Sequence, residues 1–569
     1  PAIPKNATRV NKNLAKIRKW LNSQVIKAHT KKVDDFPEAK KILSEISQSN
    51  LWRYDRPNLK ELVFEIDLED SRSINHVVTS FVQVLAVCHY LLERCCFTSI
   101  QPVNDKWAFD MFQSLNATGT PLTAIETFKP LVVNTTEQKE ESFKQSNARI
   151  FFTKVEDLFK GTRTASRKNK LTNDFLASFS TTVDGKAVSS HFSQQRKWLD
   201  ASYNHFNKKE SVDDYEKKCE FVENLGYHAE FYKNVWLDYV GKNNAVINDI
   251  VGTNGAELAS ILMLYLKDSN HKMSITILAN FYKEILRGKE NSIPEFIEAI
   301  KTISAFYTLW RSAQSNSGLD NVYRQFFKGV KDEENGYELL PHTWKAEQQG
   351  QFRSAELKRY FSYILKKEGI WDKENWKAKA SRELNYTDAS KICRFALIVT
   401  AHDTMPDDSE YGLIKPAVSG TAKYLTLEQW NSLDLKTIEH IAPQSNASYW
   451  DEGLYDETEL FQTIGNLTLL PERINSSASN RSWPEKLLYY KHLSEKDPSR
   501  QRELANKAKL KGIELNASTI DRLREANYND HIQSIVKVGE DGHWDSELVK
   551  RRTDRILDVL WERVYGWAW

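Results

Sequence analysis

Cysteine is scarce in this sequence, and its spacing excludes two classes of protein. Only five cysteines occur in 569 residues, and no two of them are separated by the Cys-x-x-Cys spacing. A structural zinc knuckle is therefore not expected. The cysteines are also too few and too scattered for a disulfide framework, so we expect a protein of the reducing cytoplasm. They are Cys88, Cys95, Cys96, Cys219 and Cys393.

Long hydrophobic runs and an excess of one charge are also missing. The longest apolar stretch, residues 77–92, contains Gln83 and His89. It is shorter than the roughly 20 residues of a membrane-spanning helix, so we predict a buried helix there and no membrane partner. No signal peptide is visible. The formal net charge of +2 excludes a uniformly basic nucleic-acid coat, so any contact with DNA must come from local patches.

Helical periodicity is the main pattern that the sequence does contain. Apolar residues recur every three or four positions over much of the chain, which predicts a predominantly α fold. The 16 Trp and 23 Tyr argue against wholesale disorder. The clearest predicted helices span residues 13–28, 39–46, 74–93, 221–240, 256–266, 275–286, 293–310 and 355–367.

Two polar stretches suggest where the chain divides. Residues 136–170 turn polar and end in a basic segment, 160–170. We predict a solvated loop for this segment, with a phosphate-contacting loop as the alternative. A second polar stretch, residues 403–411, contains Pro406, which favours a boundary shortly after it. The predicted domains are residues 1–135, a helical region at 136–425, and residues 426–569.

Two short apolar runs in the last third of the chain form the most informative pattern. Residues 437–444 read TIEHIAPQ and residues 464–470 read IGNLTLL, and we predict a strand in each. A helix-like segment, residues 483–492, follows them. Strand, loop, strand and helix, with a histidine first and amide side chains later, is the order of a ββα-metal (HNH-type) nuclease.

The residue types in this pattern suit phosphodiester hydrolysis, which needs a base to deprotonate water and a cation to neutralise charge on the phosphate. His440 suits the base, because the ordinary histidine pKa of about 6.5 leaves it partly neutral at physiological pH. Oxygen donors such as Glu439 and Asn475 suit Mg²⁺. Asn466 could fasten the loop between the strands through hydrogen bonds to backbone. In a regular strand, Glu439 and His440 point to opposite sides.

Each motif has an ordinary structural alternative. A Glu-His pair in a strand is usually a satisfied polar pair, and Gly-Asn before an apolar run is usually a turn. The joint order, with the following helix, favours the nuclease interpretation.

The same residues resemble a known family. Residues 437–486, with IEHIAPQ, GNLTLL and a closing Trp-Pro-Glu-Lys, resemble the HNH nuclease domain of GmrSD-type restriction enzymes. The run HWDSELVKRR at 543–552 looks like the closing helix of that domain. Upstream, FDMFQSLNATGTPLT at 109–123 is similar to a stretch of the family's ParB-like, nucleotide-hydrolysing partner domain. The resemblance implies a C-terminal ββα-metal unit and a partial ParB-like α+β region at 1–135.

The resemblance also implies roles for individual residues. His440 would be the general base, Asn466 would organise the hairpin loop, and Lys486 would steady the phosphate. Glu439 and Asn475 would hold Mg²⁺ or Mn²⁺, with Asn480 as a rival ligand. In the partner domain, Asn116, Thr118 and Gly119 would border a pocket for GTP, another nucleotide or DNA. The structural alternative for these three is a helix-capping turn.

One feature of the family is absent from the sequence. Relatives carry an Asp-Gly-Gln-Gln-Arg signature early in the nucleotide-handling domain, and this chain lacks it and begins with Pro1. We interpret the chain as the part that follows this signature, which leaves nucleotide hydrolysis open.

The predicted function is a metal-dependent DNA nickase of an antiphage, modification-linked restriction system. GmrSD-type enzymes act on glucosylated hydroxymethylcytosine, and the related SspE-type nickases respond to phosphorothioate-modified DNA. The single-chain layout favours the SspE-like group. A double-strand break would need a second active site, which a homo-oligomer could supply, and the sequence does not decide the oligomeric state. The alternatives are a nucleotide-driven sensor of DNA modification and a helical regulatory protein with a weak or inactive HNH unit; RNA is a lesser option as target.

Overall fold

The computed structural model divides the chain into two units, Pro1–Leu115 and Asn116–Trp569. The structure describes residues 8–26, 73–91, 95, 122–139, 142–162, 164–206, 214–237, 247–446, 448–510, 512–513, 518, 521, 523, 528–540 and 542–569. Asn116, Thr118 and Gly119 lie outside the described residues, as does the helix predicted at 39–46. The ParB-like region and the predicted domain boundaries therefore stay predictions.

The described part of the first unit consists of helices. Helix α1 (Thr8–Trp20) continues into the π-helical turn η1 (Leu21–Ile26), and α5 (Ser73–His89) packs against that turn. The helices predicted at 13–28 and 74–93 are confirmed as far as the described residues reach, to 26 and 91 respectively. Among the described residues of the whole chain, no helix is both long and apolar enough to cross a membrane.

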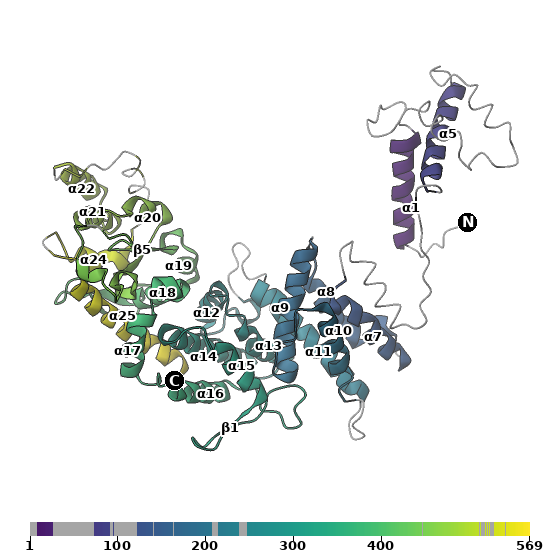
Figure 1. The fold of residues 1–569 in the computed structure, drawn as a ribbon, viewed down its shortest axis with the longest axis horizontal. Coiled ribbons are helices and arrows are strands. Elements are labelled where there is room, and N and C mark those ends of the chain that lie inside the picture. Colours follow the sequence, from purple (N-terminus) through teal and green to yellow (C-terminus); the bar gives the residue numbers. More distant parts are fainter. Residues whose placement is uncertain are drawn as a thin grey trace. The chain divides into compact units, whose positions relative to one another are not determined.

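The second unit begins with a group of helices that pack on one another (Figure 1). The group comprises α7 (Ala124–Gln138), α8 (Asn147–Leu158), α9 (Ala165–Asp184), α10 (Phe192–Tyr203) and α11 (Asp214–Phe231). Thr123 and Glu126 form a reciprocal capping box that starts α7. The basic segment at 160–170 was predicted to be a loop, but from Ala165 onward it is the first turn and a half of α9. Thr164 caps this helix by accepting a hydrogen bond from the Arg167 amide.

Helix α14 (Ser292–Ala313) is the centre of the helical core. Sixteen of its 22 residues are buried, because it packs against α12, α13, α16, α17, α18 and α25. A helix that is buried along most of its length must be surrounded in this way. Its neighbours are α12 (Ala256–Asp268), α13 (Met273–Leu286), α15 (Leu319–Lys328), α16 (Ser354–Lys367), α17 (Lys373–Glu383) and α18 (Tyr386–Ala401).

The C-terminal part contains short strands as well as helices. Among the described residues, the strands form three two-stranded antiparallel sheets. They are β1 (Val330–Asp332) with β2 (Tyr337–Leu339), β3 (Thr404–Pro406) with β4 (Ile414–Pro416), and β5 (Thr437–His440) with β6 (Leu467–Leu470). The remaining helices are α19 (Leu427–Asn431), α20 (Glu472–Ala478), α21 (Trp483–Leu493), α22 (Pro498–Leu510), α24 (Gln533–Val536) and α25 (Ser546–Ala568).

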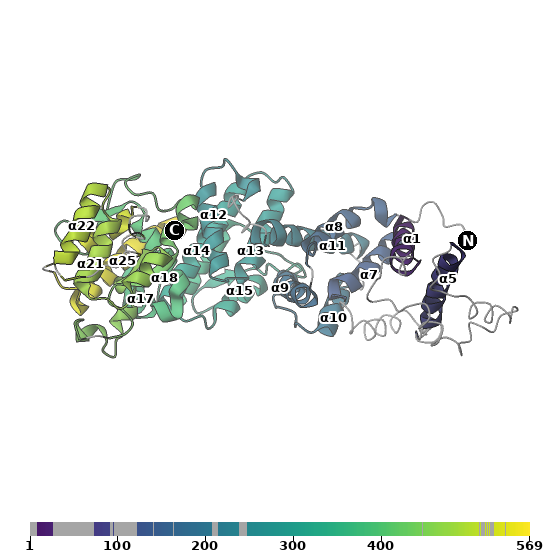
Figure 2. The ribbon, with the colours of Figure 1, turned by 90° about the horizontal axis from the view of Figure 1, so that it is seen from above.

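The long helix α25 joins the β5–β6 hairpin to the helical core. It packs against α14, α17 and α18, and also against the short helix η11 (Ile464–Asn466) that begins β6. Figures 1 and 2 show it running past α17 and α18. The predominantly helical fold is confirmed, and so are the two strands and the helix predicted around 437–492. A second helix, α20, lies between them and was not predicted.

Candidate functional site

The β5–β6 hairpin places Glu439 and His440 side by side in one strand. Glu439 pairs with Thr468 and His440 with Leu467 in an antiparallel register. Because side chains alternate along a strand, the two point to opposite faces of the hairpin. Their partners agree with this, since Glu439 contacts Lys486 of α21 and His440 contacts Tyr386 of α18.

The His440 imidazole is held by three side chains. Its Nε2 is 3.2 Å from Gln462 Oε1, and its Nδ1 is 3.3 Å from Gln444 Nε2. The Tyr386 ring lies edge-on against it, with ring centroids 4.6 Å apart. His440 is only 7% exposed, while Gln444 is exposed to solvent.

Burial sets the protonation state of His440, and the contact with Gln462 assigns its tautomer. Burial lowers its pKa from 6.5 to about 4, so the ring is neutral at pH 7. The Gln462 Oε1 can only accept, which assigns the proton to Nε2. The lone pair is then on Nδ1, on the side where the exposed Gln444 amide donates to it. A neutral imidazole with a lone pair on Nδ1 can accept a proton.

On the opposite face, Glu439 forms a buried ion pair with Lys486. The Lys486 Nζ donates to Glu439 Oε1 at 2.6 Å and to the His440 carbonyl oxygen at 2.7 Å. The side chains of Lys486 and Glu439 are 1% and 4% exposed. Burial raises the pKa of Glu439 and lowers the pKa of Lys486, and their mutual attraction opposes both shifts. Lys486 therefore contacts the hairpin and not the solvent.

Asn466 connects the loop to both strands and to the C-terminal segment. Its Nδ2 donates to the carbonyls of Ala442 (2.7 Å) and Phe461 (2.8 Å). Its Oδ1 accepts from the Ala442 amide and from Trp544 Nε1, both at 2.9 Å. The side chain is fully buried, so all four bonds are shielded from water.

Asn475 and Asn480 lie on and after α20. Asn475 lies inside α20, and its Nδ2 donates to Thr437 Oγ1 (3.1 Å) and the Ile438 carbonyl (2.9 Å). Both of these bonds use the nitrogen, so the amide oxygen is not consumed by them. Asn480 is exposed, and its backbone carbonyl accepts from the Tyr449 hydroxyl.

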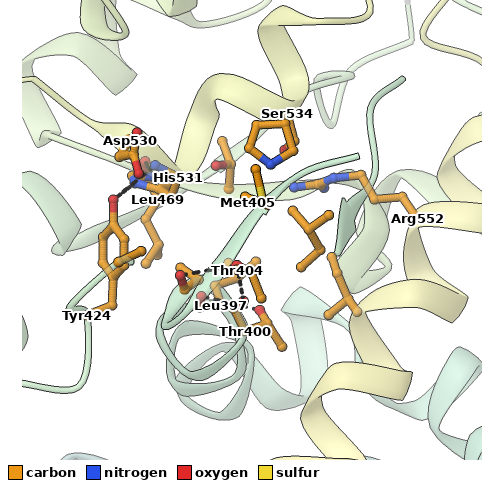
Figure 3. Close-up of a pocket in the computed structure, with 16 residues that line it drawn as sticks. Leu397, Thr400, Thr404, Met405, Tyr424, Leu469, Asp530, His531, Ser534 and Arg552 are labelled. Carbon is orange, nitrogen blue, oxygen red and sulfur yellow. Dashed lines mark hydrogen bonds between the residues drawn. The ribbon is translucent and has the colours of Figure 1, made fainter. Parts of the chain in front are cut away.

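The free edge of β6 borders a pocket shown in Figure 3. His531 Nε2 is 2.9 Å from the Leu469 carbonyl, and Arg552 of α25 donates to the carbonyls of Gly465 and Leu467. Figure 3 shows Arg552 extending from α25 into this pocket, with His531 and Tyr424 on the other side. A two-stranded sheet leaves the carbonyls of its outer edge unpaired. These side chains satisfy two of them, at Leu467 and Leu469, and also the carbonyl of Gly465 in η11.

Residues 373–559 match the family model of the GmrSD restriction endonuclease C-terminal domain. The matched region contains the hairpin, α20, α21 and most of α25, and the match suggests a restriction-system nuclease. DNA is the substrate that such a family implies. A comparison with curated proteins finds no match to the chain.

The nuclease family also implies a divalent metal ion. Within the described residues, no three His, Cys, Asp or Glu side chains lie close enough together to hold one. The oxygen donors near β5 do suit a hard cation. Glu439 Oε1 and the His440 carbonyl are bonded to the buried Lys486 ammonium, and Glu439 points to the face of the hairpin opposite His440. An ion at Glu439 would therefore have to displace Lys486.

Several residues at the site had not been given a role from the sequence. Gln444 closes the IEHIAPQ motif and Gln462 stands two residues before the IGNLTLL run, so their nearness to the motifs was the available signal. Tyr386 is far from His440 in sequence, and no local pattern marks it. Arg552 and Trp544 fall in the run that resembles the closing helix, and the structure shows what they bind.

Proposed function

We propose that residues 373–559 form a metal-dependent DNA endonuclease domain in which His440 is the general base. The observation that supports this most strongly is the state of the His440 ring. It is neutral, its Nε2 proton is held by Gln462, and its Nδ1 faces the exposed Gln444. In a domain matched to restriction nucleases, a neutral imidazole with a lone pair on Nδ1 supports the role of a general base.

The proposed reaction is hydrolysis of one DNA phosphodiester bond. His440 Nδ1 takes a proton from a water molecule as that water attacks the phosphorus, after the Gln444 side chain moves off the lone pair. Gln462 keeps the Nε2–H tautomer and stabilises the imidazolium that forms. Asn466 holds the strand ends that carry His440, through Ala442. The bond between phosphorus and the 3′-oxygen breaks as the new bond to water oxygen forms. The 3′-oxygen takes up a proton from solvent to become a 3′-hydroxyl, a 5′-phosphate is left on the cut strand, and His440 then returns its proton to solvent.

Glu439 and Asn475 are the proposed protein ligands of a Mg²⁺ or Mn²⁺ ion, with Asn480 as the alternative to Asn475. When bound, such an ion supplies positive charge to the phosphate. Lys486 is proposed to keep the Glu439 carboxylate ordered when no ion is bound, because it contacts both Glu439 and the His440 carbonyl.

We further propose that the domain nicks one strand and serves a restriction system that responds to modified DNA, with phosphorothioated DNA favoured over glucosylated DNA. The support is the sequence resemblance together with the family match. Nucleotide hydrolysis is a separate proposal for the ParB-like stretch with Asn116, Thr118 and Gly119, and release of phosphate from GTP by the full chain would test it.

The test is nicking of supercoiled plasmid by the full chain with Mg²⁺ or Mn²⁺, on unmodified, phosphorothioated and glucosylated DNA. We expect His440→Ala to lower the nicking rate by about 100-fold or more, in line with the loss of a general base. A chelator should abolish nicking by the parent protein. His191→Ala, which removes an exposed histidine at the start of α10, serves as the control and should nick at the parent rate.

Two results would contradict the proposal. If His440→Ala nicked as fast as the parent, His440 would not be the base. The second candidate function is that of a regulatory protein with an inactive HNH unit, which the neutralisation of Glu439 by Lys486 also favours. If the parent nicked none of the three DNAs with either metal, this second function would gain support.

A further inference from the structure

The pocket at the outer edge of β6 (Figure 3) is small and takes no part in the proposed nuclease reaction. Its walls come from the end of α18, from β3, β4 and β6, from the short helix η12 (Asp530–Ile532), and from α24 and α25. The pocket volume is about 40 Å³, and a single water molecule needs roughly 10–15 Å³ on the same measure. The pocket therefore has room for a few waters or one monatomic ion, and is too small for an organic ligand.

Arg552 brings a positive charge into this pocket that no carboxylate neutralises. The residue is 6% exposed, and its guanidinium forms no ion pair with the residues that the structure describes. Burial lowers its pKa from 12.5 to about 10, so it stays charged at pH 7. Asp530 also lines the pocket, but Figure 3 shows it on the side opposite Arg552, where it accepts from Tyr528 at 2.7 Å. A buried charge without a counter-ion is costly.

Two side chains of the pocket have hydrogen-bonding groups without a partner. Arg552 Nη1 donates to the carbonyls of Gly465 and Leu467, whereas its Nε and Nη2 make no hydrogen bond to the described residues. Ser534 is 2% exposed, and its Oγ likewise has no partner there. A buried hydroxyl without a partner is rare and calls for an explanation. A ligand that accepts hydrogen bonds would satisfy both groups.

Four other polar side chains of the pocket are already engaged with the protein. The hydroxyls of Thr400 and Thr404 donate to carbonyls of α18, each at 2.8 Å. His531 Nε2 donates to the Leu469 carbonyl, and the Tyr424 hydroxyl accepts from the His531 amide, both at 2.9 Å. Arg552 and Ser534 differ from these residues in having donors to spare.

A small anion suits these donors better than water does. It supplies a full negative charge to the guanidinium, whereas the two bound carbonyls and the Trp544 ring, 5.5 Å away, supply only partial charges. Hydrogen bonds to an ionised partner are also shorter and stronger than those between neutral groups. Met405, which lines the same pocket, is 40% exposed, so the pocket lies close to the surface and an ion can reach it from solvent.

We infer that this pocket binds a chloride ion, held by Nε and Nη2 of Arg552 and by the hydroxyl of Ser534. The ion neutralises the guanidinium that satisfies the carbonyls of Gly465 and Leu467, so its binding stabilises the outer edge of the β5–β6 hairpin. The inference does not depend on the proposed nuclease activity, because no step of that reaction uses the pocket.

The test is thermal unfolding of the full chain in sodium chloride, with sodium gluconate added to keep the ionic strength constant. Gluconate is an organic anion too large for the pocket. We expect the melting temperature to rise by about 2–4 °C as chloride replaces gluconate, and then to level off as the site fills.

Ser534→Ala separates a chloride site from a merely structural role. The Ser534 hydroxyl makes no bond within the described structure, so in gluconate this variant should melt at the parent temperature or above it. It should need about tenfold more chloride for half of the rise, the effect of losing one hydrogen bond to an ion. Ser476→Ala, at an exposed position of α20, is the matched control and should respond to chloride as the parent does.

A second measurement locates the ion without any variant. Crystals of the full chain soaked in sodium bromide should show an anomalous scattering peak between Arg552 and Ser534, since bromide replaces chloride and is only slightly larger. His440→Ala should keep the chloride dependence of the melting temperature, so failure of the nuclease proposal would leave this result intact.

Three results would overturn the inference. Equal melting temperatures in chloride and gluconate would mean that the pocket holds water only. A rise that Ser534→Ala shows at the same chloride concentrations as the parent would place the ion elsewhere. A bromide-soaked crystal without a peak in the pocket would exclude the site directly.

Discussion

The Glu439–Lys486 pair is the residue-scale feature on which the hairpin most depends. Two charges shielded from water lose their hydration, and only close pairing compensates for that loss. The 2.6 Å contact and the second bond from Lys486 to the His440 carbonyl provide that pairing. Lys486 also fastens α21 to β5, so one side chain serves both charge balance and the position of the helix.

At this scale we expect Lys486→Met to lower the free energy of unfolding by ~3–5 kcal/mol, because it leaves the Glu439 carboxylate buried and unpaired. Lys491→Met on the same helix is the control. Its pair with Glu540 is partly exposed, so the loss should be at most about 1 kcal/mol. Urea unfolding followed by circular dichroism measures the free energy of unfolding of both variants. Equal losses would show that the buried pair contributes no more to stability than the partly exposed one.

The residue scale also shows how far the sequence could go. It named His440, Glu439 and Asn466 from local motifs, and the structure brings all three into one hairpin. It could not say that Glu439 would be neutralised by Lys486, because that contact spans 47 positions. Nor could it find Tyr386, since nothing in the neighbourhood of that residue marks it as a partner of His440.

At the scale of elements, the hairpin is stabilised by what covers its outer edge. Two short strands are marginal by themselves, and here Arg552 and His531 take the place of a third strand by binding carbonyls of the β6 segment. Helix α25 approaches η11 so closely that a Cβ on Gly465 would lie 2.3 Å from both Thr553 Oγ1 and the Val549 carbonyl.

This close approach predicts opposite effects for two glycine-to-alanine substitutions. Gly465→Ala should lower the free energy of unfolding by ~1–3 kcal/mol, because the added methyl has no room against α25. Gly566→Ala, inside α25 with nothing within 4 Å of its Cβ position, should raise it by ~0.5–1 kcal/mol. Thermal unfolding of the two variants measures both changes. A rise in the free energy of unfolding for Gly465→Ala would mean that α25 packs less closely against η11 than the structure shows.

Elements were predictable in proportion to their length. The helices around 256–266, 275–286, 293–310 and 355–367 are all present, because several turns repeat the same apolar spacing. The three-residue strands β1 to β4 were not predicted, since so few residues carry no periodicity. Helix α20 was missed for the same reason, and with it the position of Asn475 inside a helix.

At the scale of the whole molecule, the core contains histidines that stay neutral. Burial lowers the pKa of His228 and His271 from 6.5 to about 3 and that of His531 to about 4. Each binds a neutral partner, such as Ser178 for His228 and Tyr323 for His271. Unfolding exposes these rings to water, where they take up protons at the ordinary pKa.

Stability should therefore fall as the pH is lowered through 6.5 toward 4. In that range the unfolded chain binds more protons than the folded one, because the folded pKa values are depressed, so the stability present above pH 6.5 is lost on acidification. His271→Gln should flatten this dependence, while His191→Gln, at an exposed position, should leave it unchanged. The slope is obtained by measuring the melting temperature at pH values from about 7.5 down to about 4.5. A slope that His271→Gln does not alter would remove His271 from its cause.

The sequence by itself determined the helical class, the strand–strand–helix order and the residue types of the candidate site, because short-range spacing encodes all of these. Tertiary structure decided which side chains meet. It set His440 against Gln462 and Tyr386, closed Lys486 over Glu439, and assembled the pocket around Arg552 and Ser534. Such contacts join positions far apart in the chain, and their energies depend on burial and distance, which exist only once the chain is folded.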